Sequence, residues 1–291
     1  MNRSFSEYIK IFFELGKVRI TFFVAISTSV GYVLYRSELD WKMVIVGLSV
    51  FFLSVSSSAL NHFQERKSDA LMERTKNRPI PSGKIQPFSV LLFVSIVGLL
   101  GLAVLYLEGG TVSLLLGIFA FVWYNSFYTP LKQKYALAVV PGSLIGAIPP
   151  VIGWVSGGGS ISDPQILAFA LFFFIWQIPH FWLLLMIYGS DYKQAGFPTL
   201  TEVFSQGQLG RITYIWIIAL SVSCLLIPLF SISKSYLTIS LLLLASILLL
   251  VNTKKILSPI FEKKLFWNAF LSVNLFVLAV VAILSIDKLL L

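Results

Sequence analysis

The chain has 291 residues, of which 57% are hydrophobic and 12% are charged, and its mean hydropathy is +0.87. Soluble domains carry about 25% charged residues, so this composition excludes a water-soluble globule. The net charge of +9 does not indicate a nucleic-acid-binding protein, because the basic residues lie in short pieces between apolar runs. We interpret these basic residues as signals of membrane topology and as contacts to a ligand. The sequence therefore predicts an integral membrane protein with several spans.

Apolar runs of helical length define the predicted architecture. A spanning helix needs about 20 predominantly apolar residues. Nine suitable runs occur, near residues 20–35, 43–62, 86–107, 111–128, 135–155, 164–188, 212–233, 235–253 and 265–286. Ahead of them, residues 4–15 place apolar side chains at helical spacing among charged ones, which predicts a short interfacial helix. We therefore expect one all-α membrane domain over residues 1–291, with nine transmembrane helices.

Lysine and arginine divide unevenly between the connections. The amino-terminal segment and the loops 63–85, 129–134, 189–211 and 254–264 carry 18 of the 22 basic residues. The remaining connections carry only Arg36, Lys42, Lys234 and Lys288. Cytoplasmic loops are enriched in Lys and Arg. We therefore expect the amino-terminus and both long loops, which hold the candidate active-site residues, on the cytoplasmic face.

A stripe of oxygen-bearing side chains continues from the end of the run 43–62. If the helix extends, Asn61, Glu65 and Asp69 recur every four residues and line one face over about 12 Å. Mg²⁺ prefers one or two protein carboxylates together with phosphate oxygens. Five cations follow in the same loop, namely Arg66, Lys67, Arg74, Lys76 and Arg78. Spacing alone leaves two interpretations open: a Mg²⁺–diphosphate site at the membrane surface, and a solvated helical extension with ordinary ion pairs.

A second polar cluster follows the run 164–188. It contains Asp191, Tyr192 and Lys193. Four predicted spans separate it from the first cluster, and because this number is even, both clusters emerge on the same side of the membrane. Asp191 and Lys193 can therefore face the stripe across the mouth of the helix bundle. The alternative for Lys193 is a capped loop with a snorkelling side chain.

Five segments of the chain resemble the UbiA-type intramembrane prenyltransferases. They are residues 59–83, which contain the stripe and end in Asn-Arg-Pro-Ile-Pro-Ser-Gly, 128–132 (Tyr-Thr-Pro-Leu-Lys), 146–154, 176–182 (Trp-Gln-Ile-Pro-His-Phe-Trp) and 191–198. The segments follow one another in the order expected for the family and cover about the middle half of the chain. Single segments are weak signals, whereas five in register are specific. Within the family, the sequence looks like the members that farnesylate haem B.

The resemblance implies a nine-helix bundle in a bacterial cytoplasmic membrane, with farnesyl diphosphate and haem B as substrates and Mg²⁺ as cofactor. The farnesyl group would pass to a vinyl group of haem B, with addition of water, to give haem O. The implied metal ligands are Asn61, Glu65, Asp69 and Asp191, which with Lys193 form the catalytic set. The implied substrate contacts are Arg74, Arg78, Lys132, Tyr192, Trp176, Gln177 and His180. Contact with a haem A synthase or a terminal oxidase assembly is a further expectation, for which the residues give no signal of their own.

Three positions depart from the family pattern. In the first motif, Glu65 stands where the family usually has Asp, which keeps the charge and adds a methylene group. In the second motif, the acid expected four residues after Asp191 is replaced by Ala195, and Lys193 is the candidate to supply part of the missing diphosphate contact. Near the start, residues 16–19 (Gly-Lys-Val-Arg) resemble the family's Lys-Pro-Arg sequence without its proline.

His180 is the one ionisable residue well inside an apolar run, and it follows Pro179. Two interpretations stay open: a ligand or orienting group for haem, since imidazole is a common ligand of haem iron, and a packed histidine bonded to a carbonyl that Pro179 frees. Two other functions also stay open, namely prenylation of an aromatic acid or quinone precursor, and binding or transport of haem without conversion. The predicted spans contain no Asp, Glu, Lys or Arg, which counts against an ion-coupled carrier.

Overall fold

The computed structural model describes residues 4–258 and 262–290, which form helices joined by turns and loops, without a β-strand. The longer helices are α2 (Val18–Arg36), α3 (Trp41–Asp69), α4 (Pro87–Val122), α7 (Leu144–Ser156), α8 (Pro164–Gln194), α10 (Gln206–Leu229), α11 (Tyr236–Thr253) and α12 (Lys263–Leu290). The shorter ones are α1 (Phe5–Leu15), α5 (Thr129–Leu131), α6 (Val139–Gly142) and α9 (Leu200–Val203), with a π-helical turn at Trp123–Tyr128 and a 3₁₀ turn at Lys254–Leu257. Within the described ranges, eight helical segments are long and apolar enough to cross a membrane. The predicted all-α membrane class is confirmed.

α1 matches the short helix predicted ahead of the first span. Its start is capped in both directions: Ser4 Oγ accepts a hydrogen bond from the Glu7 backbone N–H, and the Glu7 carboxylate accepts one from the Ser4 backbone N–H. At its other end, the Leu15 backbone carbonyl accepts a 3.0 Å hydrogen bond from Ser58 Oγ in α3. This bond attaches the end of α1 to α3, one turn before the predicted stripe.

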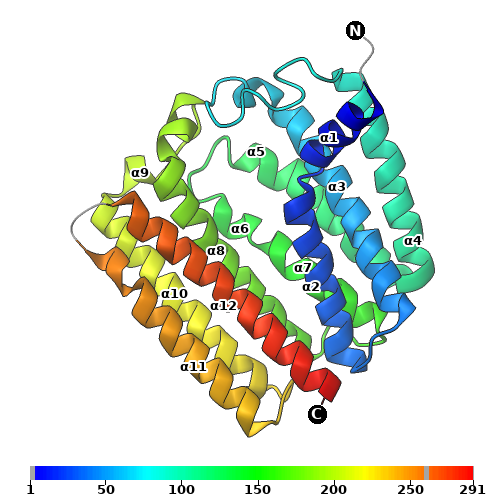
Figure 1. The fold of residues 1–291 in the computed structure, drawn as a ribbon, viewed down its shortest axis with the longest axis vertical. Coiled ribbons are helices and arrows are strands. Elements are labelled where there is room, and N and C mark those ends of the chain that lie inside the picture. Colours follow the sequence, from blue (N-terminus) through cyan, green and yellow to red (C-terminus); the bar gives the residue numbers. More distant parts are fainter. Residues whose placement is uncertain (1–3, 259–261, 291) are drawn as a thin grey trace.

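The predicted spans 86–107 and 111–128 correspond to the two helical stretches before and after Gly110, where the chain reverses direction. Gly110 has φ 78° and ψ −177°, a conformation that glycine adopts at little cost. A Cβ atom at Gly117 would lie 2.7 Å from Leu105 Cδ2, so the halves before and after Gly110 pack side by side. The reversal places both halves beside neighbouring helices of the bundle (Figure 1).

Figure 1 shows two groups of helices side by side, α2, α3, α4 and α7 in one and α8, α10, α11 and α12 in the other, with α8 packed against both α7 and α12. Close backbone contact joins α2 to α7. A Cβ atom at Gly153 would lie 1.8 Å from the Thr28 carbonyl oxygen, and one at Gly31 would lie 1.9 Å from that of Pro150. Small residues allow such approach between membrane helices. The contact joins two helices that both pack against α3.

The ends of three elements differ from the predicted runs. α3 continues seven residues beyond residue 62, to Asp69, and α8 continues six beyond residue 188, to Gln194, with Tyr188 itself non-helical (φ −119°, ψ 18°). Both extensions carry polar motifs, which a hydrophobicity criterion leaves outside a span. By contrast, the run 135–155 is helical only from Val139, and a turn at Ser143 divides it into α6 and α7.

Candidate functional site

The first polar cluster lies on the last turns of α3, on a face that other segments cover. The exposed fractions of its side chains are 1% for Asn61, 5% for Glu65 and 0% for Asp69. The helix runs through Asp69, so the prediction that the three residues share one face is confirmed. Their burial excludes the alternative of a solvated helical extension. Buried carboxylates require partners of opposite charge or hydrogen-bond donors.

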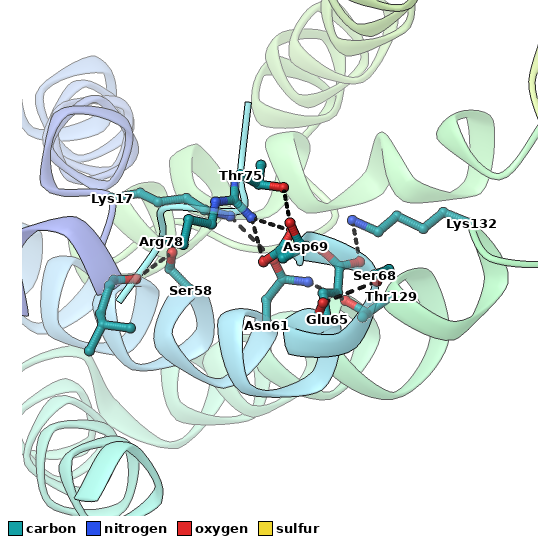
Figure 2. A network of polar contacts seen from close by, with 11 residues as sticks. Lys17, Ser58, Asn61, Glu65, Ser68, Asp69, Thr75, Arg78, Thr129 and Lys132 are labelled. Atoms are coloured by element: carbon teal, nitrogen blue, oxygen red, sulfur yellow. Dashed lines mark hydrogen bonds and ion pairs between the residues drawn. The ribbon is translucent and has the colours of Figure 1, made fainter. Parts of the chain in front are cut away.

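Asp69 is held by the loop that follows α3 (Figure 2). Arg78 Nη1 donates to both carboxylate oxygens of Asp69 at 2.8 Å, and Thr75 Oγ1 donates to the Asp69 backbone carbonyl at 2.8 Å. Thr75 is 1% exposed, and the Arg78 side chain is 17% exposed. The loop therefore folds back over the end of the helix and shields the carboxylate from solvent.

Glu65 and Asn61 are held from two other parts of the chain. Lys132, in the turn after α5, places Nζ 2.6 Å from Glu65 Oε1. Lys17, between α1 and α2, donates a 3.2 Å hydrogen bond to Asn61 Oδ1, and Asn61 Nδ2 donates to Thr129 Oγ1 at 3.1 Å. Figure 2 shows Lys17 and Lys132 reaching the α3 face from opposite sides. Segments before α2, after α3 and after α5 thus meet at one helix face.

The network sets two carboxylates, of Glu65 and Asp69, against three cations. Burial lowers the pKa of Lys17 to about 7, and the positive charges of Arg78 and Lys132 act in the same direction. Burial also acts to lower the pKa of Lys132, but the Glu65 carboxylate together with Tyr128 and Tyr124 outweighs it, and the net effect raises that pKa. Concentrated positive charge in a sheltered site attracts anions. A bound anion such as a diphosphate would favour the charged form of Lys17, so the network suits a ligand of this kind.

The oxygen donors fit Mg²⁺ shared with a phosphate ligand better than a metal held by protein alone. Within the described residues, no group of three or more His, Cys, Asp and Glu side chains could hold a metal ion. The α3 stripe offers two carboxylates and one amide oxygen, at Glu65, Asp69 and Asn61. Mg²⁺ keeps several positions for water or substrate oxygens and needs only one or two protein carboxylates. The donor set is therefore suited to Mg²⁺ that arrives with a diphosphate.

The second polar cluster lies at the same end of the molecule as the first. A cavity of about 330 Å³ separates them, lined by Gln64, Lys67 and Ser68 of α3, by Gln133, and by Ala195, Gly196 and Phe197 after α8. The two clusters are nevertheless not joined. Lys193 is 72% exposed and its Nζ lies 3.5 Å from Glu202 Oε1, and Glu202 is fixed in turn by a capping box with Thr199. Asp191 is half-buried and makes no side-chain hydrogen bond or ion pair within the part of the chain that the structure describes.

Arg74 and Tyr192 lie near this end of the molecule but outside the network. The Arg74 guanidinium carbon is 5.5 Å from the centroid of the Tyr188 ring, within cation–π distance. The Tyr192 ring contacts the Phe197 ring, with centroids 6.0 Å apart. Arg74 therefore connects the loop after α3 to the end of α8. Among the four predicted diphosphate cations, the structure brings Arg78 and Lys132 to the stripe, and it does not bring Arg74 or Lys193 there.

His180 lies in α8 beside aromatic rings and an amide. Its ring centroid is 5.3 Å from that of Trp176 and 4.9 Å from that of Phe270 in α12. Its Nδ1 lies 2.8 Å from Asn274 Oδ1, also in α12. The hydrogen bond of His180 is therefore made to a side chain of another helix, and not to a backbone carbonyl freed by Pro179.

Trp176 and Gln177 are half-buried between helices. The Gln177 side chain lies against Gly146 in α7, where a Cβ atom would come within 2.4 Å of Gln177 Nε2. The Trp176 ring contacts the Phe173 ring at 5.8 Å. Within the described residues, Trp176 Nε1 is buried without a hydrogen-bond partner. These contacts are compatible with helix packing, and the unpartnered N–H is a donor that a bound ligand could satisfy.

The structure adds residues that the sequence-based expectation lacks: Lys17, Thr75, Thr129 and Asn274. The first three lie in or beside segments that resemble the family, so the sequence carries a local signal for them without showing their contacts. Asn274 has a weaker signal, because it is one of two amides, with Asn268, in an otherwise apolar run. Its partner His180 lies 94 residues away in sequence.

Comparison with known proteins agrees with this architecture. The model of the UbiA prenyltransferase family matches residues 24–273. A protoheme IX farnesyltransferase from Geobacter sulfurreducens is 39% identical over 219 residues, which cover 74% of this chain and 80% of the relative. A protoheme IX farnesyltransferase from Oleidesulfovibrio alaskensis is 32% identical over 278 residues, covering 95% of each chain.

Solved structures show the same fold at much lower identity. A digeranylgeranylglyceryl phosphate synthase superimposes with a TM-score of 0.79 at 17% identity, over 97% of this chain and 99% of that one. A UbiA homologue from Archaeoglobus fulgidus bound to GPP and Mg²⁺ superimposes with a TM-score of 0.67 at 15% identity, over 94% and 99% of the two chains. The family match extends over most of the sequence and the fold match over nearly all of it, and the chain belongs to the UbiA prenyltransferase family.

Proposed function

We propose that the chain transfers the farnesyl group of farnesyl diphosphate to a vinyl group of haem B, with addition of water, and releases haem O and diphosphate. The observation that carries this proposal is the 32% identity to a protoheme IX farnesyltransferase over 95% of both chains. The positively charged network at the end of α3 supports it, because an allylic diphosphate needs a site that stabilises its anionic leaving group.

The proposed donor site combines a metal ion with fixed cations. Mg²⁺ would be held by Asn61, Glu65, Asp69 and Asp191, and it would in turn bind oxygens of the diphosphate. A solved UbiA homologue bound to GPP and Mg²⁺ supports this choice of metal. Mg²⁺ supplies positive charge that stabilises the departing diphosphate. Arg78 and Lys132, which neutralise the carboxylates of α3 in this structure, would contact the diphosphate oxygens.

The proposed bond changes place demands on the chain's own residues. The C1–O bond of farnesyl diphosphate breaks and leaves its electron pair on the diphosphate, where Arg78 and Lys132 stabilise the added charge. The terminal vinyl carbon of haem B bonds to farnesyl C1, which leaves a positive charge on the carbon next to the porphyrin ring. Water adds to that carbon and releases one proton. Because this proton leaves a cationic adduct, we assign no side chain as general base.

The proposed acceptor side runs along α8. Trp176, Gln177 and His180 lie within about one turn of α8, and Tyr192 lies near its end, beyond the non-helical Tyr188. Aromatic rings exclude water and offer a negative π face to a carbocation. The farnesyl chain and the porphyrin are both largely apolar, which gives a reason for placing this chemistry inside a membrane helix bundle.

We propose nine membrane crossings, counting the halves of α4 before and after Gly110 separately. α1 and the last turn of α12 lie at opposite ends of the bundle in Figure 1, as an odd number of crossings requires. The connections at the end that holds Asp69 carry most of the basic residues. The positive-inside rule then places the amino-terminus and the candidate site on the cytoplasmic face of a bacterial cytoplasmic membrane.

The decisive test is a mass-spectrometric assay of the purified protein in detergent with haem B, farnesyl diphosphate and Mg²⁺. We expect a product that carries one farnesyl group and one hydroxyl group. We expect EDTA to abolish its formation and the Asp69→Asn substitution to slow it about 10²- to 10³-fold. Prenylation of 4-hydroxybenzoate in place of haem would support the proposed diphosphate site and overturn haem B as the acceptor. Folded protein that converts neither acceptor would overturn the enzymatic proposal in favour of haem binding or transport.

A further inference from the structure

The side-chain amide of Asn274 has one orientation that its neighbours allow. Asn274 Nδ2 donates a 2.6 Å hydrogen bond to the backbone carbonyl of Phe270, one turn earlier in α12. Because a carbonyl oxygen only accepts hydrogen bonds, the amide nitrogen must face Phe270 and the amide oxygen must face α8. The atom that lies 2.8 Å from His180 Nδ1 is therefore an acceptor.

This orientation fixes the proton on the His180 ring. Asn274 Oδ1 has no hydrogen to give, so Nδ1 of His180 must carry the proton and donate it. In a neutral imidazole, the lone pair then lies on Nε2. Within the described ranges, His180 Nε2 has no hydrogen-bond partner, and it is not one of the fully buried polar atoms that lack a partner. Histidines that bind metals are commonly held in this way, through a hydrogen bond from the other ring nitrogen.

The surroundings of His180 suit a flat aromatic ligand. Three rings stand around the imidazole, with centroids 5.3 Å away for Trp176, 5.2 Å for Phe181 and 4.9 Å for Phe270. The buried N–H of Trp176, one helical turn from His180, lacks a hydrogen-bond partner within the described residues, and a bound ligand with an acceptor would satisfy it. A single imidazole among aromatic rings matches the iron of a porphyrin far better than it matches Mg²⁺, which requires oxygen ligands.

We infer that His180 Nε2 ligates the iron of the haem substrate, and that Asn274 is a positioning residue that holds the imidazole in the tautomer and orientation required. This inference rests on the proposed function. His180 lies 11 residues before Asp191, about 16 Å along α8. Iron lies at the centre of the porphyrin and the vinyl groups at its edge. Because His180 lies away from the polar end of α8, haem iron bound to it would also lie away from the diphosphate site. The vinyl-bearing edge of the haem could then extend toward that site.

The test is a titration of the purified protein with ferric haem, followed by Soret absorbance without farnesyl diphosphate. The unsubstituted protein should give the spectrum of imidazole-ligated haem, and His180→Ala should lose it, with recovery on addition of free imidazole. Asn274→Leu keeps the size of the side chain but removes the acceptor, and it should weaken haem binding about 10- to 100-fold. Asn274→Asp keeps an acceptor and should retain the ligated spectrum. Asn268→Leu, the same change at an exposed position of α12, should alter neither quantity.

Each outcome bears on a separate claim. An unchanged spectrum and haem Kd in His180→Ala would overturn the ligation. Unchanged values in Asn274→Leu, or an Asn274→Asp variant as impaired as Asn274→Leu, would overturn the positioning role. Farnesyl transfer is measured on the same preparations. If the protein transfers farnesyl but its haem spectrum does not depend on His180, this inference is overturned and the proposed function stands. If the spectrum depends on His180 but no transfer occurs, the proposed function is overturned and the haem site stands.

Discussion

The two polar clusters at the mouth of the bundle are held by different kinds of contact. The cluster on α3 is buried, and its contacts join parts of the chain that lie far apart, 44 residues for Lys17 with Asn61 and 68 for Asn61 with Thr129. The cluster at the end of α8 is only partly buried, and the ion pair of Lys193 is made to Glu202, nine residues away. The first cluster is therefore fixed by the tertiary fold, and the second by its own local segment.

This difference suggests a division of labour within one site. Charged groups that are already oriented stabilise a transition state without a cost of reorganisation, so we expect the proposed diphosphate site on α3 to be formed before any ligand binds. Segments with exposed, local contacts open at low free energy, so the end of α8 can adjust when substrate arrives. We expect substitutions in the α3 cluster to change both folding stability and chemistry, and substitutions at the end of α8 to change chemistry alone.

The largest effect is expected for Asp69→Asn. Asparagine keeps the size and one acceptor for Arg78 but removes the negative charge that would bind Mg²⁺. We expect kcat to fall by about 10²- to 10³-fold, the scale of losing one strong electrostatic contact in an active site. The measurement is the mass-spectrometric rate of product formation at saturating Mg²⁺, with size-exclusion profiles to verify folding.

Glu73→Gln is the matched control for Asp69→Asn. It removes one carboxylate from the loop that follows Asp69, but Glu73 is exposed and pairs with Lys76. Turnover of this variant should stay within about twofold of the unsubstituted protein, since exposed ion pairs contribute little. Near-normal turnover in Asp69→Asn would remove the metal-binding role from α3 and with it the contrast between the two clusters.

A smaller but still large effect is expected for Lys132→Met. The substitution removes the partner of the buried Glu65 carboxylate and a proposed diphosphate contact. Hydrogen bonds to charged groups are worth about 1.5–3 kcal/mol, so kcat/KM for farnesyl diphosphate should fall by about 10- to 100-fold. The unfolding temperature should also fall, because the carboxylate is left buried without its cation.

Two comparisons sharpen the Lys132 prediction. Lys134→Met removes a cation from the same turn at an exposed position, and it should leave both kcat/KM and the unfolding temperature unchanged. In the double variant with Glu65→Gln, the unfolding temperature should recover while turnover stays low. If Lys134→Met lowers the unfolding temperature as much as Lys132→Met does, then stability depends on the net charge of the turn and not on the ion pair between Lys132 and Glu65.

Asp191→Asn should separate chemistry from stability. Asp191 makes no side-chain ion pair within the described residues, so its charge contributes little to the ligand-free fold. As a proposed metal ligand it should lower turnover about tenfold, equivalent to ~1.4 kcal/mol in the barrier, without a change in unfolding temperature. Thermal unfolding and product formation, measured on one preparation, test the unchanged stability and the lowered turnover separately. A fall in unfolding temperature as large as that of Lys132→Met would place Asp191 in the preformed network.

How much of this site the sequence reveals depends on how far apart in the sequence the contacting residues lie. The shared face of Asn61, Glu65 and Asp69 follows from helical periodicity, a local property, and it is confirmed. The hydrogen bonds from Lys17 to Asn61 and from His180 to Asn274 depend on how helices pack, and no local pattern specifies packing. The reversal at Gly110 is intermediate, because an apolar run interrupted by two glycines predicts two spans but not their register.

The smallest effect is expected for Lys193→Met. The family resemblance implies a diphosphate contact for Lys193, but its side chain is 72% exposed and its Nζ lies 3.5 Å from Glu202. An exposed ion pair contributes about 0.2–1 kcal/mol, so kcat/KM should fall less than about fivefold, and Glu202→Gln should have a similarly small effect. The measurement is kcat/KM for farnesyl diphosphate in both variants. The contrary result would be a kcat/KM for Lys193→Met as low as that for Lys132→Met, with an unchanged or higher kcat/KM for Glu202→Gln. In that case Lys193 leaves Glu202 when the diphosphate binds, and the end of α8 closes onto the donor site during the reaction.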